Sequence, residues 1–298
     1  MQLMARLLPL GGSHEVIRSL LPPQELVFKS GRCPVAVANP NLHRVLEAGD
    51  ASDGFWVAGE AIFSASELRE VSHFELVCRC MVQETENDYK ANAAACERTA
   101  LIDAGGHAPI RLASGFTLSR IRLKPNCVGS IGDWTGEFVI ASGVAKVFKE
   151  AGLSGLSLEP VTNPKTSSAH EGCFQIYSTH VTAPVTIDCS VERIQSRFPE
   201  ENGQLRHLGC LAYPAAALAH RPDFNRTAEP WSGWHGWPSW VVSARVVSAF
   251  KGFKCRGWHF RPVLMTDTEL YSQYVAQWQQ LCDAVARTRK SQFDGGRW

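Results

Sequence analysis

The side chains best suited to recognition are gathered in one stretch near the C-terminal end of the chain. Trp231, Trp234, Trp237 and Trp240 fall within ten residues, and the first three are spaced by three with a glycine in each gap. Prolines and glycines throughout residues 220–240 predict a long loop, and long ordered loops in compact domains are often functional. Because tryptophan is among the residue types most enriched in interface hot spots, the stretch indicates a protein-binding surface.

Two charged residues, Asp223 and Arg226, begin the same stretch and provide charges that orient a partner. The predicted partner-binding set is Trp231, Trp234, Trp237, Asp223 and Arg226. The alternative is that these rings fold back and cover the core. Trp240 is expected to be a core residue, because it aligns with Phe138 in the repeat described below.

The sequence offers little for catalysis or metal binding. It has no G-x-S-x-G elbow, no H-E-x-x-H, no Walker loop and no dinucleotide glycine fingerprint. Its ten cysteines contain no C-x-x-C pair, and His207 with Cys210 supplies only two zinc ligands. Glu75 and Asp88 belong to no motif and are expected to be solvated surface carboxylates. We therefore expect no metal and no cofactor, and we assign no catalytic residue.

Composition sets the broad class of protein. The 298 residues suggest about two domains, and a hydrophobic content of 45% with 20% charged residues is ordinary for a globular protein. The formal net charge of +1 argues against a basic nucleic-acid coat or an acidic tail. Apolar runs are too short to span a membrane, and the N-terminus lacks a signal-peptide pattern. We expect a cytoplasmic protein with free, mostly buried thiols.

An internal repeat organises the second half of the chain. Residues 138–161 align without a gap with residues 240–263, at a constant offset of 102, and seven of 24 positions are identical. The identical pairs are Val139/Val241, Val144/Val246, Phe148/Phe250, Lys149/Lys251, Gly155/Gly257, Pro160/Pro262 and Val161/Val263. Apolar substitutions such as Leu156/Trp258 keep the pattern elsewhere.

Each copy is predicted to form a strand, a short helix and a second strand. Ser142 and Ser243 are candidate helix N-caps, the helix of the first copy has apolar residues at helical spacing, and Gly152 supplies its C-terminal stop. The final proline ends a ladder. The fold class is therefore predicted as α+β, with two related lobes that each end in a strand–helix–strand unit.

The Pro- and Ser-rich segment 162–172 marks the predicted boundary between the lobes. Residues 1–165 form the N-terminal α+β lobe, and residues 166–298 form the C-terminal lobe with the Trp-rich loop and a terminal helix. Helices are also expected near Ser13–Leu21, over Asp88–Asp103 and after Asp267. The last has Leu270, Tyr274, Trp278, Leu281 and Val285 on one stripe. Residues Phe74–Val82 read as one strand, which places Cys78 and Cys80 on the same face.

The repeat also carries a family resemblance. The pattern Gly132-Asp-Trp134, Phe138 to Ser142, Phe148 to Gly155 and Pro160-Val161 resembles bacterial immunity proteins of polymorphic and contact-dependent toxin systems, including the double-CXXCG family. The second copy has a similar pattern over residues 242–263. This chain has no CXXCG motif, so the resemblance implies no zinc site. It implies a cytoplasmic, non-enzymatic protein that binds and neutralises one cognate toxin.

Two other functions remain open from the sequence. An enzyme, either a hydrolase or a nucleotide-modifying protein, would place its site in a cleft between the lobes. A structural subunit of a larger assembly would use the same Trp-rich loop. We expect a protein toxin as partner, without nucleic acid or membrane.

Overall fold

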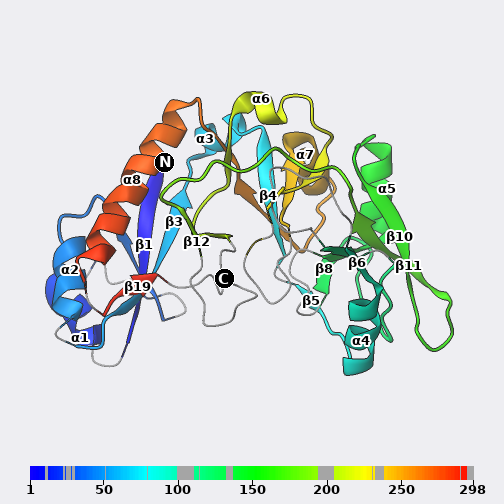
Figure 1. Cartoon of the computed structure of the whole chain (residues 1–298), viewed down its shortest axis with the longest axis horizontal. Coiled ribbons are helices and arrows are strands. Elements are labelled where there is room, and N and C mark those ends of the chain that lie inside the picture. Colours follow the sequence, from blue (N-terminus) through cyan, green and yellow to red (C-terminus); the bar gives the residue numbers. More distant parts are fainter. Residues whose placement is uncertain are drawn as a thin grey trace.

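The computed structural model describes residues 1–10, 13–22, 24, 28, 31–50, 52–78, 80–98, 111–113, 115–131, 137–193, 205–229, 231, 238–288 and 290–293. Helices and strands are interspersed along the described residues, and most strands pair antiparallel. This arrangement confirms the predicted α+β class. Figure 1 shows the N-terminal sheet at one end of the molecule and the elements around α5 at the other.

The N-terminal sheet is completed by the C-terminal end of the chain. It has the order β19-β3-β1-β2, formed by β1 (Gln2–Pro9), β2 (Cys33–Ala36), β3 (Phe55–Ile62) and β19 (Gln292–Phe293). Alternate residues Leu3, Ala5 and Leu7 of β1 are fully buried on one face. That face packs against α1 (Ser13–Leu20), α2 (Leu42–Gly49) and α8 (Glu269–Ala286).

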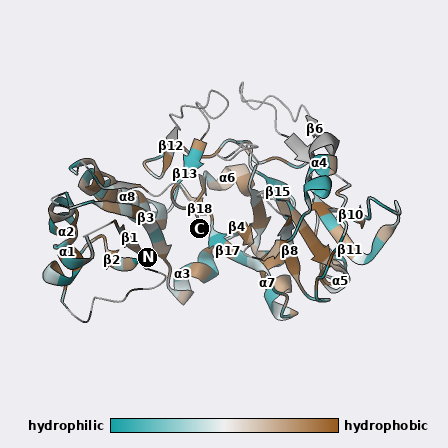
Figure 2. Ribbon diagram, turned by 90° about the horizontal axis from the view of Figure 1, so that it is seen from below, coloured by the Kyte–Doolittle hydropathy of each residue, from teal (hydrophilic) through white to brown (hydrophobic). Residues whose placement is uncertain are grey.

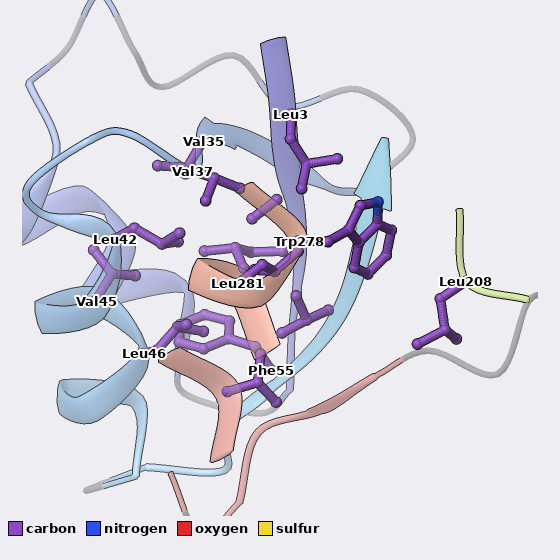
Figure 3. Close-up of a cluster of buried hydrophobic side chains, with 14 of the residues drawn as sticks. Leu3, Val35, Val37, Leu42, Val45, Leu46, Phe55, Leu208, Trp278 and Leu281 are labelled. Atoms are coloured by element: carbon purple, nitrogen blue, oxygen red, sulfur yellow. The ribbon is translucent and has the colours of Figure 1, made fainter. Parts of the chain in front are cut away.

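Helix α8 confirms the predicted amphipathic stripe. Thr268 caps its N-terminus by accepting a hydrogen bond from the Tyr271 amide. Four of the five residues of the stripe are buried, and Leu270 packs at the edge of the same cluster. Figure 3 shows Trp278 and Leu281 among side chains from β1 and α2, with Leu208 approaching from a segment distant in the sequence.

The two repeat copies form the predicted units. The first copy forms β9 (Phe138–Ala141), α5 (Ser142–Glu150) and β10 (Ser157–Thr162); the second forms β16 (Trp240–Ser243), α7 (Ala244–Gly252) and β17 (Trp258–Pro262). The predicted N-cap position is confirmed for Ser243 and wrong for Ser142. Ser142 is the first residue of α5, and Ser243 occupies the N-cap position without a side-chain bond to α7, because its hydroxyl donates to Asp223.

In each copy a third strand lies between the two strands of the unit and runs antiparallel to both. Strand β11 (Ala169–Tyr177) separates β9 from β10, and β4 (His73–Cys78) separates β16 from β17. Phe174 lies opposite Ile140 and Pro160. At the equivalent position Phe74 lies opposite Val242 and Pro262. Strand β15 (Phe224–Arg226) completes the second sheet beside β16, whereas β8 (Val128–Ile131) lies beside β9 and is followed at the edge by β5 (Met81–Val82).

These pairings replace the predicted division at residue 165. That boundary would separate β10 from β11, which are neighbours in one sheet, and β4 from its partners β16 and β17. The two copies are therefore not the ends of two lobes. They face each other in one region, which contains residues from both sides of the predicted boundary.

The two copies share one hydrophobic core. The Phe148 and Trp258 rings, one from each copy, stack with centroids 5.7 Å apart, and Phe138 contacts Trp240 at 6.4 Å. Trp240 is 0% exposed, which confirms that it is a core residue, and Trp258 is 5% exposed. Helices α5 and α7 lie next to each other in both views (Figures 1 and 2). In Figure 2 the nearby strands β8 and β11 are mostly brown, the hydrophobic end of the scale.

Each copy accepts an equivalent hydrogen bond from a strand of the other copy's sheet, β15 or β8. The Phe224 amide donates to the Ser154 carbonyl at 3.1 Å, and the Val128 amide donates to the Arg256 carbonyl at 2.8 Å. The glycine that follows in each turn, Gly155 or Gly257, has positive φ and no room for a Cβ beside the opposing carbonyl. The glycine shared by the two copies is therefore required for this close approach.

The remaining elements connect these parts. They are α3 (Ala65–Glu70), α4 (Glu86–Ala95), β6 (Cys96–Arg98), β7 (Arg111–Ala113), β12 (Val191–Arg193), β13 (Leu205–His207), β14 (Ala212–Tyr213), α6 (Ala215–Leu218) and β18 (Leu264–Met265). None of the helices in the described ranges is long and apolar enough to cross a membrane.

Two predicted elements end earlier than expected. The helix expected over Asp88–Asp103 ends at Ala95, because Cys96–Arg98 pairs with β7 instead. The strand expected over Phe74–Val82 divides into β4 and β5, which belong to different sheets. The prediction that Cys78 and Cys80 share one strand face is therefore wrong.

Candidate partner-binding site

One hydroxyl group, that of Thr227, binds both ends of residues 231–239, which we call the Trp-rich segment. Thr227 Oγ1 accepts hydrogen bonds from Trp231 Nε1 and from the Ser239 amide, both at 3.0 Å, and donates to the Glu229 carbonyl at 2.8 Å. The Thr227 amide also donates to the Ser239 carbonyl. This hydroxyl therefore uses its full bonding capacity, and it holds the two ends of residues 231–239 next to each other.

Trp231 points into the protein and is only 7% exposed. Its ring packs edge-on against His207, with centroids 4.6 Å apart, and its backbone bridges to Leu205. The ring is therefore an anchor for the segment, and the prediction that it contacts a partner is corrected. Trp234 and Trp237 lie outside the described residues, so their predicted contact role stays a prediction.

Asp223 is also buried, at 4% exposure. Its carboxylate accepts hydrogen bonds from the Ser154 amide and hydroxyl, from the Ser243 hydroxyl and from Arg245. Burial alone would raise the pKa of Asp223, but the hydrogen bonds from Ser243 and Ser154 hold it below its ordinary value. Asp223 joins the two repeat copies and does not orient a partner, which corrects its predicted role.

Arg226 is buried as completely, at 1% exposure. Its guanidinium donates to Glu137 at 2.9 Å and lies 4.4 Å from the centroid of the Trp240 ring. Gln175 donates to the other oxygen of Glu137. Burial raises the pKa of Glu137, although Arg226 opposes that shift. Arg226 therefore neutralises a buried carboxylate, and its predicted partner contact is corrected.

A second buried network is centred on Glu75 and reaches the end of the Trp-rich segment at Ser239. Glu75 Oε1 accepts from the Ser239 hydroxyl at 3.1 Å and lies 3.2 Å from His207 Nε2, and its Oε2 accepts from Arg261 at 3.1 Å. The other ring nitrogen of His207 lies 3.0 Å from the Gly209 carbonyl. One carboxylate thus joins β4, β13, β17 and the end of the Trp-rich segment.

The charge of Glu75 is stabilised by these contacts. Burial would raise the pKa of Glu75, but the charges of His207 and Arg261, with the bonds from His207 and Ser239, hold it at about 2. Glu75 is 3% exposed, so the expectation of a solvated surface carboxylate is wrong. Asp88 is 1% exposed and bonded to Thr85 and Ser119, which overturns the same expectation.

The side chains of these networks are bonded to other protein groups, which leaves few of them to bind a metal or transfer a proton. Across the described ranges, no group of three or more His, Cys, Asp or Glu side chains is arranged to hold a metal ion. Burial raises the pKa of Cys210 to about 12, which keeps this thiol protonated. A surface hollow between α2 and α8 is lined by Asn39, His43, Asp283 and Arg287.

The sequence contained one signal for the Glu75 network. Glu75 lies between Phe74 and Leu76 in an apolar run, so it occupies the opposite face of a buried strand. A carboxylate in such a strand requires cationic partners. Its partners, His207 and Arg261, are more than a hundred residues away in sequence, and no local pattern identifies them.

Comparison with protein-family models and with curated protein sequences finds no match. The resemblance to immunity proteins therefore stays a prediction.

Proposed function

We propose that this protein is a cytoplasmic immunity-type protein, which binds one cognate bacterial toxin and neutralises it by occlusion without catalysis. The observation that carries the proposal is the fixed base of the Trp-rich segment. Thr227 holds both ends of residues 231–239, and Glu75 fastens Ser239 to a central strand. A loop closed at a rigid base loses less conformational entropy on binding than a free one.

The chemistry of the Glu75 network favours binding over the enzyme alternative. Both oxygens of Glu75 and both ring nitrogens of His207 contact other protein groups. His207 is only 12% exposed, and Trp231 covers one side of it. A general base must reach a substrate proton, whereas these groups are fully used in holding the fold.

The test is coexpression with the toxin-like protein encoded by the neighbouring gene, read as protection of growth and as copurification. Of the predicted partner-binding residues, Trp234 and Trp237 remain as candidates for contact with the toxin. We expect Trp234→Ala/Trp237→Ala to abolish protection and copurification while the protein stays folded. Trp56→Ala is the matched control, because Trp56 is an exposed tryptophan on β3, at 38% exposure. The proposal is contradicted if the wild-type protein does not protect growth against the toxin-like protein, or if the double variant still protects it.

A further inference from the structure

The turn that follows α7 has a different chemical character from its counterpart after α5. In the first copy, residues 149–154 read Lys-Glu-Ala-Gly-Leu-Ser; in the second, residues 251–256 read Lys-Gly-Phe-Lys-Cys-Arg. Relative to the first copy, the second lacks the acidic Glu150 and has Phe253, Lys254 and Arg256 in place of small or polar residues. The first copy therefore serves as an internal reference for what the turn requires structurally.

The backbone of both turns contains one residue in the left-handed region. It is Gly152, with φ of 58°, in the first copy and Lys254, with φ of 53°, in the second. Glycine adopts this conformation without strain, whereas lysine does not. Hydrogen bonds from the Lys254 amide to Lys251 and from Asn126 to the Lys254 carbonyl hold the strained residue in place. Strain of this kind indicates a functional side chain.

The altered turn presents an apolar ring among cations. Phe253 is 57% exposed, and Lys251, Lys254 and Arg256 are exposed around it. Lys124 is exposed and lies two residues before Asn126, whose backbone carbonyl accepts from the Arg256 amide and whose side chain donates to the Lys254 carbonyl. We call Lys124, Lys251, Phe253, Lys254 and Arg256 the basic turn surface.

The positive charge of the basic turn surface is not balanced by ion pairs within the described part of the chain. None of its four cations forms an ion pair with a carboxylate there. The ranges 115–131 and 244–263, which carry these cations, contain no Asp or Glu. In a chain of net charge +1, this is a local excess of positive charge.

We propose that the basic turn surface docks onto an acidic patch of a partner protein, with Phe253 as its apolar centre. A cluster of cations around one exposed aromatic ring matches the composition of protein interfaces. A nucleic acid would extend beyond the patch and meet the acidic remainder of a nearly neutral chain, whereas nucleic-acid-binding domains are basic overall. The inference extends the proposed protein-binding function and adds a second contact surface to it.

The test uses a short fluorescein-labelled peptide rich in glutamate, with one leucine, and fluorescence anisotropy at low ionic strength. We expect Lys251→Gln/Lys254→Gln to weaken binding by about fivefold, because exposed charge pairs each contribute modestly. Lys146→Gln/Lys149→Gln removes two exposed lysines from α5 and carries the same charge change. This control is expected to bind as the wild type does. Phe253→Ser is expected to weaken binding without changing the charge.

Each arm has a contrary result. Absence of peptide binding by the wild type, or equal weakening by both double variants, overturns the proposal. Tighter binding of a labelled single-stranded oligonucleotide than of the peptide overturns the assignment to a protein partner. The peptide assay contains no toxin, so its result is independent of the toxin test. If the peptide does not bind but the toxin still copurifies with the protein, only the proposal for the basic turn surface is contradicted. A missing toxin complex with normal peptide binding contradicts the proposed function alone.

Discussion

Glu75 joins four separate segments of the described chain through its two carboxylate oxygens. Replacing it with glutamine keeps its shape but leaves Arg261 and His207 without a carboxylate in a buried place. We expect Glu75→Gln to lower the free energy of unfolding by about 3 kcal/mol, as for a buried ion pair that loses one partner. Urea denaturation measures the change. Glu171→Gln, an exposed carboxylate on β11, is the control and should leave the midpoint unchanged.

The same residue makes stability depend on pH in a defined direction. The pKa of Glu75 is lowered from 4.5 to about 2 in the folded protein, so its contribution is complete above pH 4.5 and is lost as pH falls toward 2. That contribution is about 3 kcal/mol. Because other carboxylates also titrate there, the quantity to compare is the difference between wild type and Glu75→Gln, which should shrink with falling pH. A constant difference across this interval contradicts the assignment.

Substitution of Lys254 measures how much the left-handed backbone of its turn lowers the stability of the protein. Lys254→Gly relieves the left-handed backbone and should raise the free energy of unfolding by about 1 kcal/mol. Gly152→Lys is the reverse exchange in the first copy, where a Cβ meets open space and only the backbone opposes it. It should destabilise by a similar amount. Thermal or urea denaturation of both variants measures the pair, and an unchanged Lys254→Gly midpoint shows that the turn carries no strain.

At the scale of elements, the base of the Trp-rich segment depends on Thr227. Thr227→Val keeps the branched shape but leaves the Ser239 amide and Trp231 Nε1 without their acceptor. We expect a loss of about 2 kcal/mol in the free energy of unfolding, the cost of unsatisfied buried donors. Thr166→Val, in the exposed turn before β11, is the control for removal of a hydroxyl. Equal urea midpoints for the two variants would mean that the base is not held by this hydroxyl.

Elements with strong local periodicity were predictable, and those defined by distant partners were not. The stripe of α8 and the strand–helix–strand units follow from residue spacing, and both are present. The end of α4 and the break between β4 and β5 depend on strands far away in sequence. Trp231, Asp223 and Arg226 have the composition of a contact surface. Only their long-range contacts, with Ser154, Glu137 and His207, show that they are internal.

At the scale of the whole molecule, the two copies take their central strands from elsewhere in the chain. The first copy receives its central strand from β11, which follows it, whereas the second receives β4, which precedes both copies in the chain. The reciprocal bonds of Ser154 and Arg256 resemble an isologous dimer interface within one chain. The two halves therefore stabilise each other, and neither sheet is built from one continuous segment.

This arrangement predicts how the chain responds to being cut. Division in the exposed turn at residues 165 and 166 removes β11 from β9 and β10, and removes β4 from β16 and β17. We expect residues 1–165 and residues 166–298 to lack a cooperative unfolding transition when each is expressed alone. Coexpressed, they should associate and recover it, since an exposed turn tolerates a break. Circular dichroism and size-exclusion chromatography measure both outcomes. A fragment that folds alone would mean that the exchanged strand is dispensable to its sheet.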